Sequence, residues 1–161
     1  MELLSICAFC GAKLFPVLCT RGTLVVAEQE CLQCRSSKTW RNQNYVGSIP
    51  EVNLAISCGI LFSGATPTKA LAMLQCMEIE SIAYSTFMEH QRFYLHPVVQ
   101  KVWLDEQTRL VRDLRNRGGA TAFGGDGRAD SPGHCAKFGS HSLMDLRAGK
   151  IVAVELVQVS G

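Results

Sequence analysis

Two pairs of cysteines carry the clearest chemical signal in the sequence. Cys7 and Cys10 form one C-x-x-C pair, Cys31 and Cys34 form a second, and 20 residues lie between the pairs. Four thiolates at this spacing can hold a zinc ion tetrahedrally, because each tight turn supplies two ligands. Four protein ligands leave no position open for water, so we expect a structural zinc rather than a catalytic one. A set of buried or redox-active thiols is the alternative.

The other cysteines lack this pairing. Cys19 could compete as a ligand but has no partner at the right spacing, whereas Cys58, Cys76 and Cys135 are expected to be ordinary small apolar side chains.

A basic segment directly follows the second cysteine pair. Arg35, Lys38 and Arg41 surround Trp40 in the stretch RSSKTWRNQ. Cations beside an aromatic ring can bind a nucleic-acid backbone and stack on its bases, which makes this segment a candidate DNA contact. In the alternative interpretation, Trp40 packs over the cysteine-rich segment and the charges are only solvated.

Two aspartates lie in a glycine-rich stretch near the C-terminal end. The run ATAFGGD predicts a short strand that ends at Asp126, where a metal ion and a phosphate could approach closely. Carboxylates in such positions hold Mg²⁺ in phosphoryl-transfer enzymes of the two-metal type. Asp130 could be a second catalytic ligand or could cap the loop, and Asp145 is expected to be mostly structural. Composition alone favours a plainer interpretation, in which these are acidic turn residues.

Length and composition fit a folded protein of one or two small domains. The chain has 161 residues, of which 47% are hydrophobic and 19% charged, with a net charge of +2. This balance does not indicate a strongly basic nucleic-acid binder, although local basic faces remain compatible with it. We expect no signal peptide and no membrane span. Eight cysteines, four of them paired as metal ligands, favour a reducing compartment, the nucleus or the cytoplasm.

The sequence divides into three segments: a cysteine-rich module over residues 1–45, a helical segment over 46–118 and a strand-rich segment over 119–161. In the helical segment, Ser48 and Glu51 fit a capping box, and Gly64 can end the first helix. Thr66 and Pro67 predict the start of a second helix.

Residues 66–95 are compatible with a DNA-binding helix-turn-helix. Its second helix would present His90 and Arg92 to solvent, where they could reach phosphates or base edges. Pro97 is expected to kink or split that helix. The turn lacks the usual glycine, so a plain helical linker is the alternative.

The final segment predicts a β-hairpin. SLMDL and IVAVELVQV are apolar or β-branched runs joined by a turn at RAGK. The second run is nearly all apolar, which predicts a strand covered on both faces.

The stretch FGGDGRADSPGHCAKFGSHSLMDLRAGKIVAVELVQ resembles the opening of the RNase H-like core in eukaryotic cut-and-paste DNA transposases of the Kolobok type. In that family a D-G-R-x-D-S-P-G-x-x-A-K run precedes a short strand containing M-D. The matching residues are Asp126, Gly127, Arg128, Asp130, Ser131, Pro132, Gly133, Ala136, Lys137, Met144 and Asp145. The upstream stretches ILFSGATPTKALAML and YSTFMEHQRFYLHPVV and the paired-cysteine segment also resemble this family, so the resemblance covers most of the chain.

The resemblance implies an α+β fold made of a small zinc-ribbon-like module, a helical segment and the first three strands of an incomplete RNase H-like sheet. It places the first catalytic carboxylate at Asp126, with Asp130 as the second choice, and implies Mg²⁺ or Mn²⁺ as the cofactor of the parent family. The family core needs two further acidic residues, and Glu155 is not where the family has the second one.

We therefore expect a truncated or domesticated transposase-derived protein, located in the nucleus, that binds zinc and could bind DNA but has no catalytic activity by itself. An incomplete sheet would also leave a strand edge exposed, through which copies of the chain could pair. The alternative function is a zinc-ribbon adaptor that binds another protein.

Overall fold

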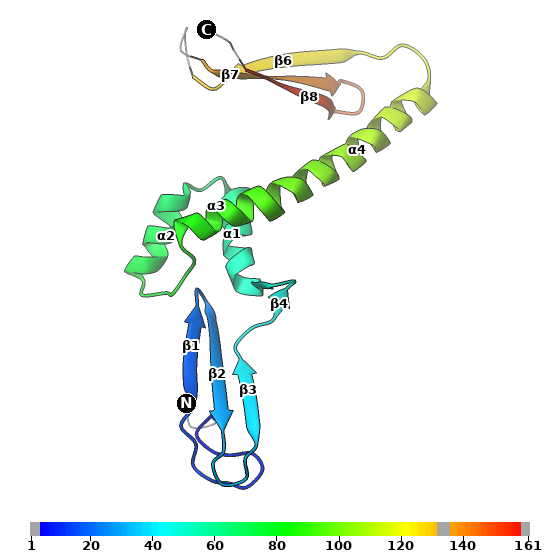
Figure 1. The fold of residues 1–161 in the computed structure, drawn as a ribbon. Helices are drawn as coiled ribbons and strands as arrows, with labels where there is room; N and C mark the ends of the chain where they lie inside the picture. Colours follow the sequence, from blue (N-terminus) through cyan, green and yellow to red (C-terminus); the bar gives the residue numbers. More distant parts are fainter. Residues whose placement is uncertain (1–3, 132–135, 159–161) are drawn as a thin grey trace. The chain divides into compact units, whose positions relative to one another are not determined.

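The structure is a computed structural model that describes residues 4–131 and 136–158. It is α+β, which confirms the fold class at that level, and it divides into two compact units, Met1–Pro97 and Val98–Gly161 (Figure 1). The boundary between the units falls within a helical stretch; the predicted three-segment division stays a prediction. In the described part of the chain, no helix combines the length and the apolar character that crossing a bilayer requires.

The first unit begins with a three-stranded antiparallel sheet of order β1-β2-β3. Its strands are β1 (Val17–Arg21), β2 (Leu24–Glu30) and β3 (Ser37–Arg41). The turn between β1 and β2 contains Gly22, which has a φ of +59°, a conformation that glycine adopts without strain. One cysteine pair lies in the segment before β1, and the other lies in the loop between β2 and β3.

Asn53 joins this turn to the first helix. Its Oδ1 accepts hydrogen bonds from the backbone N–H and the hydroxyl of Thr23, at 2.9 and 2.7 Å. Its Nδ2 donates to the carbonyl of Arg21 at 2.9 Å, so both polar atoms of a side chain that is only 4% exposed are paired. A Cβ at Gly22 would lie 2.7 Å from Asn53 Oδ1, and glycine is therefore required here for a second reason.

The start of helix α1 (Glu51–Ser63) differs from the prediction. Its N-cap is Pro50, without a side-chain cap, because Ile49–Pro50 form strand β5 and pair with strand β4 (Tyr45–Val46). This pairing keeps Ser48 away from the capping position. The end of the helix is as predicted: Gly64 is the C-cap, with a φ of 70° in the left-handed region.

Four further helical stretches complete the first unit and lead into the second. Helix α2 (Pro67–Cys76) begins at the predicted proline, and α3 (Tyr84–His90) continues through the π-helical stretch η2 (Gln91–Leu95) into α4 (His96–Arg117). The π-helical stretch ends at Leu95, two residues before Pro97, which has no N–H to donate, so the predicted kink or split of the helix takes the form of a π-helical turn. Ile60, Ile82 and Phe87 form the buried core between α1, α2 and α3.

The second unit contains an antiparallel sheet of order β6-β7-β8. Its strands are β6 (Phe123–Ala129), β7 (Phe138–Asp145) and β8 (Lys150–Gln158), and the last two form the predicted hairpin. The expectation that the last strand is covered on both faces is wrong for the residues described: Leu156 is 82% exposed and Val157 57% exposed, whereas Val152 is buried. The hydrophobic run reflects β-propensity more than burial here.

Polar contacts connect α4 to this sheet within the second unit. Arg117 donates to Asp145 Oδ2 at 2.8 Å, and the Asp145 side chain is 1% exposed. Asp145 Oδ1 also accepts from the backbone N–H of Arg147 at 3.0 Å, and Gln107 Nε2 donates to the carbonyl of Val152 at 3.1 Å. Asp145 is thus a buried, fully paired structural carboxylate, in agreement with its expected role.

Candidate metal centre

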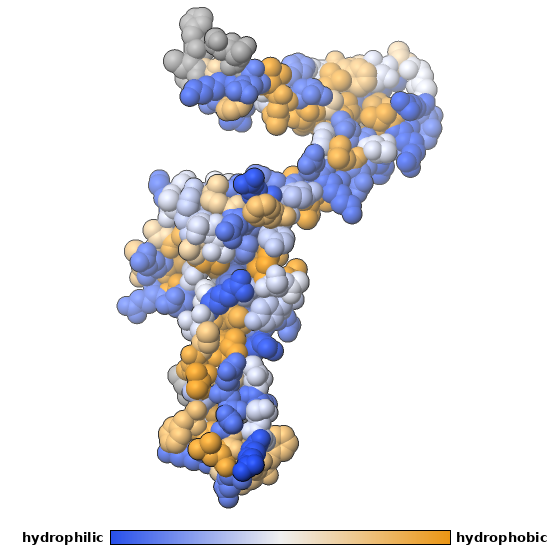
Figure 2. Space-filling view, viewed as in Figure 1, coloured by the Kyte–Doolittle hydropathy of each residue, from blue (hydrophilic) through white to orange (hydrophobic). Residues whose placement is uncertain are grey.

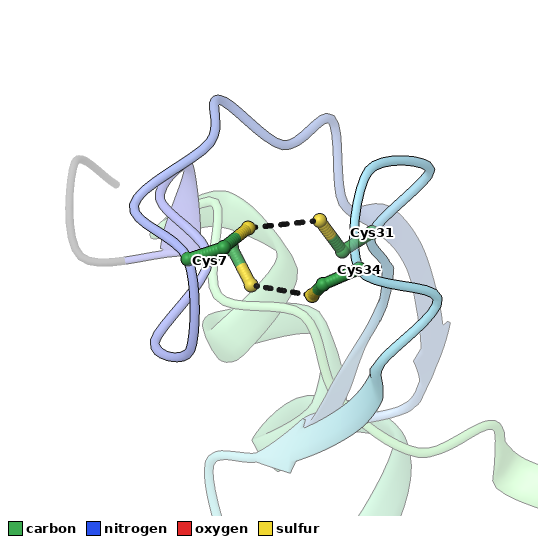
Figure 3. Close-up of side chains that lie close together, drawn as sticks. Cys7, Cys31 and Cys34 are labelled. Carbon is green, nitrogen blue, oxygen red and sulfur yellow. Dashed lines mark hydrogen bonds between the residues drawn. The ribbon is translucent and has the colours of Figure 1, made fainter.

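The four cysteines of the two C-x-x-C pairs lie together. All of their Sγ atoms are within 4.8 Å of one another. Cys7 Sγ is 3.6 Å from Cys34 Sγ, and Cys10 Sγ is 3.5 Å from Cys31 Sγ (Figure 3). A tetrahedral zinc ion with Zn–S bonds of about 2.3 Å separates its sulfurs by roughly 3.8 Å, so the donor set fits zinc. Disulfide bonding would need about 2 Å, and all four thiols are free.

Each C-x-x-C pair lies in a tight turn, here called a knuckle, which spans residues 7–12 or 31–36. The two knuckles have the same backbone hydrogen bonds. The N–H of Gly11 donates to the carbonyl of Cys7 at 3.0 Å, and the N–H of Arg35 donates to the carbonyl of Cys31 at 2.7 Å. Gly11 and Arg35 both have positive φ, of 73° and 56°. This left-handed residue turns the chain so that both sulfurs of a pair face the same point, and Figure 3 shows the side chains of Cys7, Cys31 and Cys34 directed toward one another.

In each knuckle, the backbone N–H of the first cysteine also donates to the carbonyl of the residue five positions later. The N–H of Cys7 donates to the carbonyl of Ala12 at 2.8 Å, and the N–H of Cys31 donates to the carbonyl of Ser36 at 2.9 Å. Cys7 and Cys31 are buried, together with Leu14, whereas Cys10 and Cys34 are exposed. One ligand of each pair therefore anchors the small core, and the other closes the site from outside.

Ser36 distinguishes the second knuckle from the first, which has Ala12 at the matching position. Its hydroxyl lies 3.0 Å from Cys34 Sγ and 3.5 Å from Cys7 Sγ, where it can donate to a thiolate. A comparison of the sequences CAFCGA and CLQCRS would have shown this serine, but the sequence analysis missed it.

The environment of the cluster favours thiolates at two of its positions. The Ser36 hydroxyl and the backbone N–H groups of Cys10 and Phe9 lower the pKa of Cys7 to about 6. The Ser36 hydroxyl and backbone N–H likewise lower the pKa of Cys34. At Cys10 the backbone N–H of Ala12 also lowers the pKa, but burial and the neighbouring thiols outweigh it and raise the pKa to about 12. Without metal the cluster keeps a proton at Cys10, and zinc would displace it on binding.

The basic residues that follow the second pair are all exposed, but the structure does not place them on one face. Lys38 and Trp40 share one face of strand β3, because side chains alternate along a strand. Arg41 points to the opposite face, where its guanidinium lies 5.9 Å from the centre of the Tyr45 ring. Glu28 is opposite Thr39 and therefore on the face of Arg41, whereas Gln29 is opposite Lys38.

The expectation that His90 faces solvent is wrong. His90 is only 6% exposed, and its Nδ1 lies 2.9 Å from the hydroxyl of Ser57, which is itself fully buried. It faces the helical core because α3 packs against α1, a tertiary contact that the local sequence pattern does not show. Arg92 is exposed, as predicted, and its guanidinium lies 5.2 Å from the centre of the Phe93 ring.

Asp126 is exposed, but it does not end a strand. Strand β6, an edge strand of the sheet, continues to Ala129, and Asp126 lies in the middle of this strand, paired with Ser142 of β7. The glycines around it can pair because β7 supplies continuous backbone partners. The imidazole of His141 also covers Gly125, where a Cβ would lie 3.1 Å from Cε1.

Asp130 caps the loop. Its Oδ1 accepts from the N–H of Lys137 at 3.1 Å and lies 3.4 Å from the hydroxyl of Ser131. Three residues of extended chain lie between Asp126 and Asp130, which sets their Cα atoms about 13 Å apart, so we do not expect the two carboxylates to share one ion. Among residues 4–131 and 136–158, the four cysteines are the only group of three or more potential ligands close enough to share a metal.

These features define an α+β protein with a cluster of four cysteines whose sulfur atoms could hold one metal ion. Comparisons with models of known protein families, with curated proteins and with solved structures find no match. Cys135, expected to be an apolar side chain, lies outside the described residues.

Proposed function

We propose that this chain is a zinc-binding and DNA-binding protein derived from a cut-and-paste transposase. The four-cysteine cluster supports the zinc part, since its sulfur spacing fits one tetrahedral ion. The resemblance of residues 123–158 to the opening of an RNase H-like core supports the transposase part. The antiparallel order β6-β7-β8 is compatible with the first three strands of such a core.

The observation that carries the DNA-binding part is the pair of exposed side chains Lys38 and Trp40 on β3. Lys38 and Trp40 lie side by side there, directly after the metal knuckle that fixes the start of the strand. The residues opposite them on β2, Gln29 and Ala27, are buried and carry no negative charge. A cation beside an indole ring, on a strand held rigid by zinc, suits a phosphate and an adjacent base. DNA binding in turn favours the nucleus as the location.

We also propose that the chain alone does not cleave DNA. Two-metal catalysis needs several carboxylates around ions about 4 Å apart. Asp126 belongs to no group of three potential ligands in the described part of the chain, and Asp130 is occupied in capping its loop. Mg²⁺ or Mn²⁺ would be a cofactor of the parent family rather than of this chain by itself.

The test is salt-dependent binding of the zinc-loaded protein to DNA. We expect measurable binding to duplex DNA at low salt, weakening as salt increases, and a salt slope reduced by about 1 for Lys38→Ala. Lys101→Ala is the matched control, because Lys101 is an exposed lysine in the second unit without an ion pair among the described residues. An equal reduction of the salt slope in Lys38→Ala and Lys101→Ala would contradict the proposal. The absence of DNA binding at low salt would also contradict it.

A protein-binding adaptor is the second candidate, and exposed apolar side chains around the metal site favour it. Phe9 and Leu32, each inside a C-x-x-C turn, are 75% and 92% exposed, and Phe15 is 82% exposed. Figure 2 shows hydrophobic residues, in orange, on the surface of the part that holds β1–β3. Replacing Phe9 and Leu32 by serine would leave DNA binding intact under the first function, and would abolish partner binding under the second.

A further inference from the structure

The four sulfurs of the metal cluster do not have equal surroundings. Cys7 and Cys31, the first cysteines of the two pairs, are only 4% and 2% exposed, whereas Cys10 and Cys34 are exposed. Oxidants and alkylating agents react preferentially with accessible thiolates. Reactivity toward a dissolved reagent is therefore decided between Cys10 and Cys34.

The surroundings of Cys10 and Cys34 differ by one hydroxyl. Each sulfur accepts from the backbone N–H two residues later, that of Ala12 or of Ser36. Cys34 Sγ also lies 3.0 Å from the Ser36 hydroxyl, whereas Ala12 occupies the matching position in the first knuckle and has no side-chain donor. A zinc-bound sulfur carries no proton, so in the metal-bound state the hydroxyl donates to it.

This hydroxyl makes Cys34 the weaker nucleophile of the two exposed sulfurs. A hydrogen bond to an anionic sulfur stabilises its charge, and groups that bond to metal ligands tune those ligands in this way. The thiolate lone pair is what attacks an oxidant or an alkylating agent. Of the four ligands, Cys10 is the one that combines exposure with the absence of the Ser36 hydrogen bond.

The contacts between the sulfurs indicate which one reacts next. Cys10 Sγ is 3.5 Å from Cys31 Sγ, and Cys7 Sγ is 3.6 Å from Cys34 Sγ, so each of these contacts joins the two knuckles (Figure 3). The Ser36 hydroxyl is also 3.5 Å from Cys7 Sγ and so lies beside both sulfurs of the second contact. Cys31 is therefore the neighbour placed to react with a modified Cys10.

We propose that Cys10 is the ligand that hydrogen peroxide oxidises first, and that the product is a disulfide between Cys10 and Cys31. The Cys10 thiolate attacks one peroxide oxygen, so that an S–O bond forms, the O–O bond breaks and hydroxide leaves. The Cys31 thiolate then attacks the oxidised sulfur: an S–S bond forms, the S–O bond breaks and a second hydroxide leaves. The two thiolates together lose two electrons, the peroxide gains them, and both hydroxides take protons from the solvent to become water.

This modification opens the metal site. Only Cys7 and Cys34 remain as thiolates, and two ligands do not complete a tetrahedral zinc site. Oxidation therefore releases zinc, and reduction of the disulfide by an added thiol restores all four ligands. The inference rests on the zinc binding proposed above and adds where, and in which order, the site is modified.

The first test treats the zinc-loaded full chain with hydrogen peroxide, blocks the remaining thiols with N-ethylmaleimide and maps the disulfides by tandem mass spectrometry. We expect a disulfide between Cys10 and Cys31 as the main product, with one zinc released for each disulfide formed. A main product that joins Cys7 to Cys34, a disulfide within either pair, or no oxidation would overturn the proposal. The zinc content before treatment separates the two claims. A chain that holds zinc but forms another disulfide overturns this inference alone, whereas a chain that retains no zinc overturns both.

The second test changes the one hydroxyl by which the knuckles differ. Ser36→Ala should raise the reaction rate of Cys34 in the zinc-loaded chain with limiting iodoacetamide about 3- to 10-fold, toward that of Cys10. Ala12→Ser places a hydroxyl at the matching position of the first knuckle and should slow the reaction of Cys10 by a similar factor. Ser37→Ala, an exposed serine next to Ser36, is the matched control and should leave both rates as in the wild type. Unchanged rates in Ser36→Ala and Ala12→Ser, or a wild-type Cys34 that reacts faster than Cys10, would contradict the proposal.

Discussion

Arg35 occupies the same left-handed backbone position in the second metal knuckle as Gly11 does in the first. Their φ angles are 56° and 73°, and each N–H donates to the carbonyl of the first cysteine of its pair. Only glycine adopts this conformation without strain, so the second knuckle carries a conformational cost that the first does not.

Arg35→Gly should therefore stabilise the module. We expect the free energy of unfolding of the zinc-bound protein to rise by about 0.5–1 kcal/mol, because relief of strain exceeds the added freedom of the unfolded chain. Arg35→Ala is the control: it removes the same charge but keeps the Cβ. Urea unfolding checks this, and equal stability of the two variants would show that the backbone at Arg35 is not strained.

Gly22→Ala should destabilise the first unit more than Gly47→Ala. Both glycines have positive φ, 59° and 61°, but a Cβ at Gly22 meets the Asn53 side chain whereas one at Gly47 meets nothing within 4 Å. We expect the free energy of unfolding to fall by about 2–4 kcal/mol for Gly22→Ala and by about 1 kcal/mol for Gly47→Ala. Trp40 fluorescence in a Trp103→Phe background reports the unfolding of this unit, and similar losses would contradict the contact with Asn53.

Acid should destabilise the second unit through Asp145. Burial raises the pKa of this carboxyl, but Arg117 and the backbone N–H groups of Arg147 and Ala148 outweigh it, and the net pKa is lowered. A lowered folded-state pKa gives stability that is present above the unfolded-state value near 4 and is lost as pH falls through the folded-state value.

Asp145→Asn should remove that part of the pH dependence and lower stability at neutral pH. The readout is Trp103 fluorescence during urea unfolding in a Trp40→Phe background, at several pH values between 2 and 7. Parallel pH profiles for the variant and the parent would mean that Asp145 does not contribute to acid sensitivity.

Incubation with supercoiled DNA and Mg²⁺ or Mn²⁺ should give no nicking by this chain. Asp126 belongs to no group of three or more potential ligands among the described residues, so we expect that two ions are not held. Cleavage that persists through purification and disappears in Asp126→Ala would contradict this, and Asp130→Ala is the control for loop integrity.

The sequence predicts well where one local rule decides the structure. The cysteine spacing alone indicates that Cys7, Cys10, Cys31 and Cys34 converge, and Gly64 and Pro67 mark a helix end and a helix start. Local rules fail where a tertiary contact competes with them. Ser48 does not cap α1, because the next two residues pair as a strand with Tyr45–Val46.

Two features, the burial of His90 and the continuation of strand β6 past Asp126, could not be predicted from the sequence. His90 lies on what reads as a polar helix face, but packing of α3 on α1 places it against Ser57. Strand β6 likewise continues past Asp126 only because β7 pairs with its glycines. Nothing in the local sequence signals either partner.

Zinc binding by the four cysteines is the central claim, and X-ray absorption at the zinc edge on the purified chain tests it most directly. We predict one zinc per chain with four sulfur ligands at about 2.3 Å, lost in Cys31→Ser and unchanged in Cys19→Ser. The account would be contradicted by nitrogen or oxygen ligands on the zinc, or by a chain that retains no zinc. An equal loss of zinc in Cys31→Ser and Cys19→Ser would also contradict it.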